Sequence, residues 1–250
     1  MSLVNTERIG HVLVITLNRP ERRNAVDRAL ADELDAALNL LDDDPDLWCG
    51  VLTGEGPVFC AGSDLASGGD YVTERGGEYG IIRRDRSTPL IAALQGSAFG
   101  GGLEIALACD LIVASRDAVL GLPEVKRGLI PTCAGLFRGP RALPVNIATE
   151  MALSGEPITA ERAAGFGLVN HVAEPGEVRQ KALAVAEAIC ANGPLAVRLA
   201  RGVIAAYVGA TDDHGFALTD AAQVQVRESE DSREGIAAFF EKRAPRWSGR

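Results

Sequence analysis

Apolar and polar residues follow two different periods along the first half of the chain. Residues 12–17 are rich in β-branched side chains, which fit a pleated sheet, and residues 6–11 join them to an earlier β-like run, as in a hairpin. Asp27 precedes apolar positions that recur at helical spacing up to Leu41, so the pattern predicts a helix capped by that aspartate. This alternation continues downstream and predicts a layered α/β fold with crossover connections. Further strands are expected at 51–53, 90–94 and 110–114, a helix at 100–108, and a flexible glycine-rich loop at 66–77.

From about residue 142 onward the pattern becomes helical. One strand candidate, at 168–172, interrupts it, and no strand candidate follows residue 193. We therefore expect two regions: a core over residues 1–193, and a helical region over 194–250 that folds onto something else, such as another subunit. The expected helices are 145–153, 160–165, 177–191, 194–207, 214–228 and 232–243.

Composition and charge narrow the class of protein. The 250 residues are 47% hydrophobic and 24% charged, a mixture typical of globular proteins, and the formal net charge is −9. Nucleic acid and anionic membranes attract positive charge, so neither is an expected partner of this acidic chain. The N-terminus lacks the pattern of a signal peptide, and the five cysteines are irregularly spaced without a C-x-x-C pair. We expect a cytoplasmic protein with reduced thiols and no metal site.

Two glycine-containing segments are candidates for ligand binding. Residues 59–65 (FCAGSDL) follow a strand and a Gly/Pro turn, and their small side chains let the backbone approach a ligand closely. A tight strand-to-helix turn capped by Asp64 is the alternative. Residues 96–104 (GSAFGGGLE) place three glycines at a helix start, where N–H groups and the helix dipole favour an anion or a developing oxyanion.

Two glutamates near these glycines are candidates for proton transfer. Glu104 is equally explained as a capping-box acid or an acid favoured by the helix dipole. Glu124 follows a proline, which is also an ordinary helix-start pattern. If the two carboxylates converged on a glycine-lined anion site, proton transfer and oxyanion stabilisation would be available together. Sequence spacing leaves that convergence open.

Positive charge is concentrated near the two ends of the chain. Four arginines lie within residues 19–28, and four further basic residues surround Trp247 in residues 242–250. A basic loop with an aromatic side chain suits a compact phosphorylated ligand. The alternative is a solvated face.

Six segments together resemble the enoyl-CoA hydratase/isomerase (crotonase) superfamily over nearly the full length of the chain. Each segment alone is a weak signal, but six in the right order are highly specific. They are 18–25 (N-R-P…N-A), 59–65 (F-x-A-G-x-D-[LI]), 95–110 (N-G-x-x-x-G-G-G-x-E…C-D, with Gln95 for Asn), 123–131 (P-E-[VI]…G-[LI]-x-P), 160–170 (A-x-x-A-x-x-x-G-L-V) and 240–243 (F-x-E-K-R).

The resemblance implies the crotonase (ClpP-like) fold, an α/β spiral of ββα units with a C-terminal helical trimerisation region, assembled as a homotrimer or a dimer of trimers. It implies acyl-CoA or enoyl-CoA substrates and a role in fatty acid or lipid metabolism. Coenzyme A is then part of the substrate, so no separate cofactor is expected. Both glutamates are retained, which favours hydration of a 2-enoyl-CoA to a 3-hydroxyacyl-CoA. The alternatives are a dehydratase of the carnitinyl-CoA type, an enoyl-CoA isomerase, a hydrolase, and a non-catalytic acyl-CoA-binding protein.

The resemblance also implies residue roles. It gives the backbone N–H groups of Ser63 and Gly101 to the oxyanion hole, and it makes Glu104 and Glu124 the catalytic carboxylates. We expect Glu104 to orient and activate water and Glu124 to act as the acid to Cα.

The CoA is expected near the segment around Arg22 and near a C-terminal lysine supplied by a neighbouring subunit. Thr132 and Cys133 stand where the family usually has glycines, so we expect them to line or narrow the acyl pocket, with Cys133 as a buried filler rather than a nucleophile. The expected substrate-binding residues are Arg22, Asn24, Ala25, Ala61, Gly62, Ser63, Asp64, Leu65, Gly100, Thr132 and Lys242.

Overall fold

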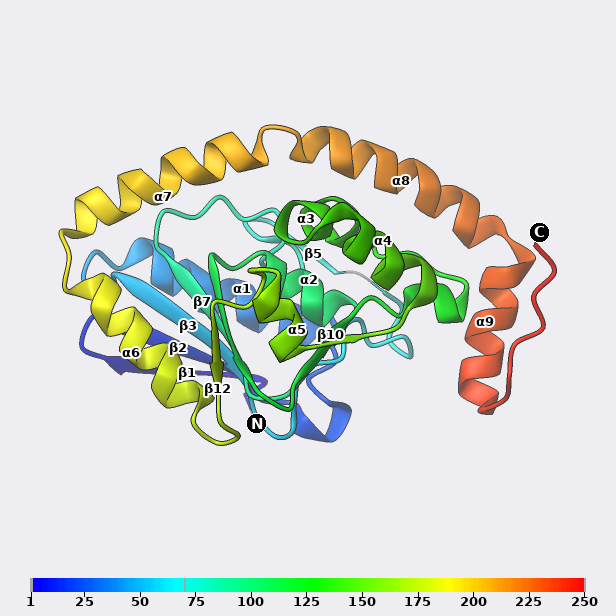
Figure 1. Cartoon of the computed structure of the whole chain (residues 1–250), viewed down its shortest axis with the longest axis horizontal. Helices are drawn as coiled ribbons and strands as arrows, with labels where there is room; N and C mark the ends of the chain where they lie inside the picture. The colour runs from blue at the N-terminus through cyan, green and yellow to red at the C-terminus, as the bar shows by residue number, and fades with distance from the viewer. Residues whose placement is uncertain (1, 70, 250) are drawn as a thin grey trace.

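A six-stranded sheet forms the centre of the molecule in the computed structural model, which describes residues 2–69 and 71–249 (Figure 1). The first two strands pair antiparallel, and every other neighbouring pair is parallel. The central strands are buried on both faces, which explains their continuous apolar runs. In spatial order the strands are β1 (Val4–Ile9), β2 (Val12–Leu17), β3 (Cys49–Gly54), β7 (Leu90–Leu94), β9 (Leu111–Ser115) and β12 (His171–Ala173).

The two faces of this sheet are covered by different helices. Along β2, Leu13, Ile15 and Leu17 pack into the core cluster that contains the apolar face of α1 (Arg28–Asp43). Val12 and Val14 point to the other face, where they pack in the cluster that contains α6 (Val178–Cys190). Burial of each such side chain contributes roughly 1.5–3 kcal/mol. The α/β layering predicted from the sequence is therefore confirmed.

A smaller four-stranded sheet carries the candidate chemistry. Its strands are, in spatial order, β11 (Ile158–Thr159), β10 (Val119–Gly121), β8 (Ser97–Phe99) and β4 (Val58–Cys60). β4 and β10 both run parallel to β8, with Cys60 and Leu120 each paired with Ala98. Parallel strands end at the same edge of a sheet, so the segments after residues 60, 99 and 121 leave it side by side.

Local chemistry explains the elements that were predicted well. The Asp27 carboxylate accepts the backbone N–H of Leu30 at 2.9 Å, which confirms it as the cap of α1. The hairpin is also confirmed, but its expected connection was too long, because residues 6–9 belong to β1 and only Gly10 and His11 form the turn. Polar residues on the exposed face of β1 disguised that strand.

Other boundaries differ from the sequence pattern. The strand expected at 168–172 is β12, at 171–173, and α3 (Gly135–Ala142) was not expected, because Gly139 and Pro140 lie inside it. The expected loop at 66–77 contains β5 (Val72–Thr73) and the first residue of β6 (Gly77–Glu78), while residue 70 lies outside the described residues. The remaining helices match their expected ranges closely: α2 (Gly101–Leu107), α4 (Val145–Ser154), α5 (Ala160–Gly165), α7 (Pro194–Gly209), α8 (Asp212–Glu228) and α9 (Glu230–Glu241).

α7 and α8 arch along one side of the body, and α9 turns down at the far end of that arch, beside the C-terminus (Figure 1). α8 packs through Phe216, whose ring meets that of Phe137 at 5.0 Å. α7, all of whose residues the structure describes, buries none of its side chains and is tied to the core by Arg201, which pairs with Asp110 at 2.9 Å. Within the described residues, no single helix is long and apolar enough to cross a membrane; α6 and α7 satisfy that test only as a pair bent by 106°. The division at 193/194 stays a prediction.

Candidate active site

Two of the candidate segments touch each other at the edge of the small sheet. A Cβ added at Gly62 would lie 2.8 Å from the backbone nitrogen of Gly101, and Gly62 has a left-handed φ of +88°. Only glycine fits this position without strain. The close approach brings the backbone of Ser63 beside the first residue of α2, where the helix dipole supplies partial positive charge.

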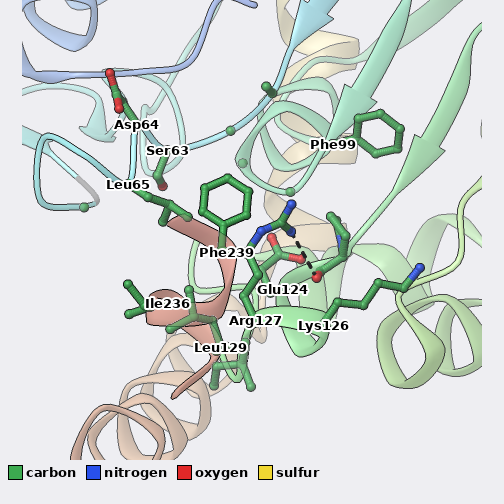
Figure 2. A pocket seen from close by; sticks show the side chains of 18 of the residues that line it. Ser63, Asp64, Leu65, Phe99, Glu124, Lys126, Arg127, Leu129, Ile236 and Phe239 are labelled. Atoms are coloured by element: carbon green, nitrogen blue, oxygen red, sulfur yellow. Dashed lines mark hydrogen bonds between the residues drawn. The ribbon is translucent and has the colours of Figure 1, made fainter. Parts of the chain in front are cut away.

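Both glutamates line one cavity together with these residues. The cavity has a volume of about 1270 Å³, and its lining includes Ser63, Gly101, Glu104 and Glu124. Figure 2 shows Ser63 and Glu124 facing the same space from different segments of the chain, and Phe239 of α9 also borders that space. The structure therefore brings together the two carboxylates whose convergence the sequence left open.

Glu104 is buried and held by a segment far away in sequence. Its Oε1 accepts the backbone N–H of Cys133 at 2.7 Å and that of Gly135 at 2.8 Å. Ala134, between those two residues, has a left-handed φ of 80°, which lets the chain turn around the carboxylate. Glu104 is thus not explained as a capping acid of its own helix, and the two charge-assisted hydrogen bonds fix its orientation.

Glu124 opens a short 3-10 helix, η2 (Glu124–Arg127), which two residues separate from the end of β10. A Cβ added at Gly100 would lie 2.8 Å from Glu124 Oε1, so the carboxylate rests against the glycine that precedes α2. The two acids therefore flank the same glycine-led helix start. This arrangement is able to move protons to and from a ligand held at that helix start.

Most of the predicted substrate-binding residues lie on the cavity wall. Two do not belong to its lining. Asn24 is buried, and its amide bonds the backbone of Arg19, Glu55, Val58 and Phe59, which is a structural role. Lys242 is the exposed C-cap of α9, and its predicted contact with CoA bound to a neighbouring subunit stays a prediction. Substrate binding stays a prediction for the residues that do line the cavity: Arg22, Ala25, Ala61, Gly62, Ser63, Asp64, Leu65, Gly100 and Thr132.

Asp64 has a structural partner as well as a place on the wall. Its Oδ2 accepts from Arg19 at 2.8 Å, and its Oδ1 accepts the N–H of Ala66. Partial burial disfavours the charged carboxylate, but the hydrogen bond and charge of Arg19 hold the pKa of Asp64 below its ordinary value. The expectation that Asp64 caps a helix is wrong: among the described residues, turns follow it instead.

Thr132 and Cys133 differ in their relation to the cavity. Thr132 belongs to the lining, whereas the fully buried Cys133 does not. Cys133 contributes its backbone N–H to Glu104, and its side chain fills the core cluster, as expected for a buried filler. No three His, Cys, Asp or Glu side chains gather as a metal site in the part of the chain that the structure describes.

The cavity also contains residues that the sequence did not single out. Tyr79 and Phe99 contribute to its wall, and α9 adds Ile236 and Phe239 (Figure 2). The only sequence signal for the α9 residues was the F-x-E-K-R segment beside them. Further basic residues on the wall are Arg23, Lys126, Arg127, Arg227, Arg233 and Arg243.

Comparison with known proteins places this site in a family. The sequence model of the enoyl-CoA hydratase/isomerase family matches residues 7–250. Enoyl-CoA hydratase EchA19 of Mycobacterium tuberculosis is 38% identical over 98% of this chain and 96% of its own length, and a carnitinyl-CoA dehydratase of Proteus mirabilis is 36% identical over 96% of each. The crystal structure of carnitinyl-CoA hydratase from Mycobacterium avium superposes with a TM-score of 0.95, at 41% identity over 100% of both chains. The chain belongs to the enoyl-CoA hydratase/isomerase (crotonase) family and has its fold.

Proposed function

We propose that the protein catalyses the reversible syn addition of water to a 2-enoyl-CoA thioester, which gives a 3-hydroxyacyl-CoA. The observation that carries this proposal is the lining of one cavity by Glu104, Glu124, Ser63 and the first residue of α2. Hydration needs two proton-transfer groups and a site for a developing enolate oxygen. The lining supports the proposal, because it includes two carboxylates and the two residues whose backbone N–H groups we assign to the enolate oxygen.

The proposed reaction uses each of these groups once. Water adds its oxygen to Cβ while negative charge develops on the thioester oxygen, and the N–H groups of Ser63 and Gly101 stabilise that charge. Each such donor contributes roughly 3–4 kcal/mol in the transition state. Glu104, fixed by two N–H groups, orients water and accepts its proton. Glu124 donates a proton to Cα.

Besides a hydrolase, the alternatives to hydration are a dehydratase, an isomerase and a non-catalytic binding protein. Dehydration of a carnitinyl-CoA-type substrate runs the same chemistry in reverse, and relatives named carnitinyl-CoA dehydratase and hydratase favour it. Double-bond isomerisation needs only one shuttling base, so the second glutamate speaks against it. A non-catalytic acyl-CoA-binding protein would have no use for either acid.

Mixing the protein with crotonyl-CoA tests the proposal. We expect the absorbance of the conjugated enoyl thioester to fall as 3-hydroxybutanoyl-CoA forms, and chromatography identifies the product. Movement of the double bond in a 3-enoyl-CoA without hydration would favour an isomerase instead. Binding without turnover on crotonyl-CoA and on a panel of longer, branched and aromatic enoyl-CoA thioesters would favour the binding protein.

The proposal extends to the setting of the protein. All five cysteines are free thiols, which supports a cytoplasmic location. Coenzyme A enters and leaves as part of the substrate, so we propose no separate cofactor. The resemblance supports a role in fatty acid or lipid metabolism.

Arg22 and Arg23 are proposed to bind the phosphates of CoA. Both are exposed and line the cavity. Replacing either with alanine should raise KM for crotonyl-CoA about tenfold, since a hydrogen bond to a charged group contributes about 1.5–3 kcal/mol. KM for crotonyl-pantetheine, which lacks the nucleotide phosphates, should change little. Arg28→Ala, in the same segment but outside the lining, serves as the control; equal effects on both thioesters would contradict phosphate binding.

A homotrimer or dimer of trimers is proposed through α7. Leu195, Leu199, Val203 and Tyr207 recur every four residues and are 62% to 85% exposed. An apolar stripe of this kind marks an interaction surface. Leu199→Glu with Val203→Glu should therefore reduce the mass measured by light scattering to that of one chain, with an unchanged circular dichroism spectrum. Leu40→Glu, an exposed site on α1, is the control; an unchanged mass for the α7 variant would contradict the proposal.

A further inference from the structure

We propose that Tyr79 is a positioning residue that fixes the two backbone donors of the oxyanion hole. The inference rests on the proposed function, because it concerns the thioester oxygen of a bound substrate. Three observations carry it: a hydrogen bond to Ser63, a contact with Gly101, and an unusual backbone conformation at Tyr79 itself.

The phenol hydroxyl of Tyr79 joins the side chain of one donor residue. Tyr79 Oη lies 2.6 Å from Ser63 Oγ, and either oxygen is able to donate. Tyr79 is 1% exposed, yet it belongs to the cavity lining. A hydroxyl pair of this length restricts the geometry of both side chains. The bond therefore limits how far the peptide of Ser63 is able to rotate.

The ring of Tyr79 packs against the other donor residue. A Cβ added at Gly101 would lie 2.6 Å from Tyr79 Oη and 2.8 Å from Cε2 and Cζ. The phenol thus occupies the space in which any other residue at 101 would place its side chain. One aromatic side chain touches the residues on both sides of the oxyanion hole, which sets their separation.

Tyr79 has a strained backbone conformation, and this conformation directs its side chain toward Ser63 and Gly101. Its φ is 56°, in the left-handed region, which is rare for a bulky residue. A Cβ on the adjacent Gly80 would lie 2.7 Å from the carbonyl oxygen of Ala31 and 2.8 Å from the backbone nitrogen of Asp35, so the turn is wedged against α1. Strain of this kind persists where the surrounding structure imposes it, and it clusters at functional sites.

Packing against Gly101 requires only the ring of Tyr79, so its hydroxyl group distinguishes a positioning role from a packing role. A phenylalanine would fill the same volume beside Gly101 but would lose the bond to Ser63. Tyr79→Phe and Ser63→Ala each remove the same hydrogen bond, so the double variant has no further part of that bond to lose. If the bond acts on catalysis, the loss of kcat in the double variant equals the loss in each single variant, and is not the product of the two.

The test measures these three variants in two ways. Steady-state kinetics with crotonyl-CoA give kcat and KM. Infrared difference spectroscopy with butanoyl-CoA, carrying ¹³C at the thioester carbonyl, gives the carbonyl stretch of a bound analogue that is not hydrated, and the stretch falls as the oxyanion hole polarises the bond. Tyr71→Phe, in the same loop but outside the lining, is the matched control; its hydroxyl bonds the carbonyl oxygen of Ser67.

We expect kcat to fall about ten- to a hundredfold in each single variant and to the same level in the double variant, with KM changed less than about threefold. The carbonyl stretch in Tyr79→Phe should move back toward its value in solution, while Tyr71→Phe matches the wild type. A wild-type kcat and stretch in Tyr79→Phe, or multiplied losses in the double variant, would overturn the inference. If the wild-type protein hydrates no enoyl-CoA, the proposed function fails, and the infrared shift alone decides the role of Tyr79.

Discussion

Glutamine in place of Glu124 is expected to lower kcat for crotonyl-CoA by a factor of about 10²–10⁴. The amide has nearly the same shape as the carboxyl group but neither gives nor accepts the proton. Glu124 lies against Gly100 at the start of α2, so the substitution changes proton transfer with little effect on the cavity wall. Glu104→Gln should lower kcat by a similar factor. Its amide oxygen still accepts the N–H groups of Cys133 and Gly135, so the side chain keeps its place and only proton transfer is lost.

Steady-state kinetics check this prediction, with Glu161→Gln as the control. Glu161 is exposed and pairs with Arg116 on the surface, so its variant should match the wild type. KM should stay within about threefold in both active-site variants, since transition-state interactions are lost rather than ground-state binding. Turnover that is unaffected by either substitution would remove both glutamates from the mechanism.

Alanine in place of Gly101 is expected to lower kcat at least a hundredfold, the usual cost of losing one oxyanion-hole donor. The added methyl group would fall 2.6 Å from the hydroxyl of Tyr79, whose side chain is buried. Relief of that clash moves the backbone nitrogen at position 101 away from the substrate oxygen. The measurement is kcat together with the melting temperature, to separate a displaced donor from an unfolded chain.

Gly139→Ala provides the matched control for this substitution. Gly139 is also a buried helical glycine, but a Cβ there meets nothing within 4 Å. Its variant should keep wild-type kcat and gain a little stability, because alanine is the better helix former. A folded Gly101→Ala variant with wild-type kcat would show that the N–H at 101 does not hold the thioester oxygen.

Local signals made much of the fold predictable. Asp27 caps α1 with a side-chain oxygen, and β7 and α5 have the predicted limits, because capping and apolar runs act over a few neighbouring residues. α3 could not be predicted in the same way, because Gly139 and Pro140, which normally break helices, both lie inside it. The polar residues of β1 gave no strand signal over residues 6–9, because that part of β1 is a strand through its pairing with β2.

The candidate site shows the same division between local and long-range information. The motifs around Ser63, Glu104 and Glu124 were visible in the sequence, but their meeting depends on β4 and β10 both running parallel to β8. Tyr79 had no sequence signal at all, because its role comes from a left-handed turn wedged against α1. Asn24 matched the family segment, yet its amide serves the backbone rather than the cavity.

The central claim is that two carboxylates face the same side of one alkene while two amide hydrogens hold its thioester oxygen. A crystal structure of the Glu104→Gln/Glu124→Gln variant with crotonyl-CoA tests it most directly. We predict a thioester oxygen within about 3.2 Å of the backbone nitrogens of Ser63 and Gly101, with both glutamine side chains on the same face of the double bond, one near Cβ and one near Cα. A thioester oxygen bound elsewhere, or a double bond distant from either side chain, would contradict the account.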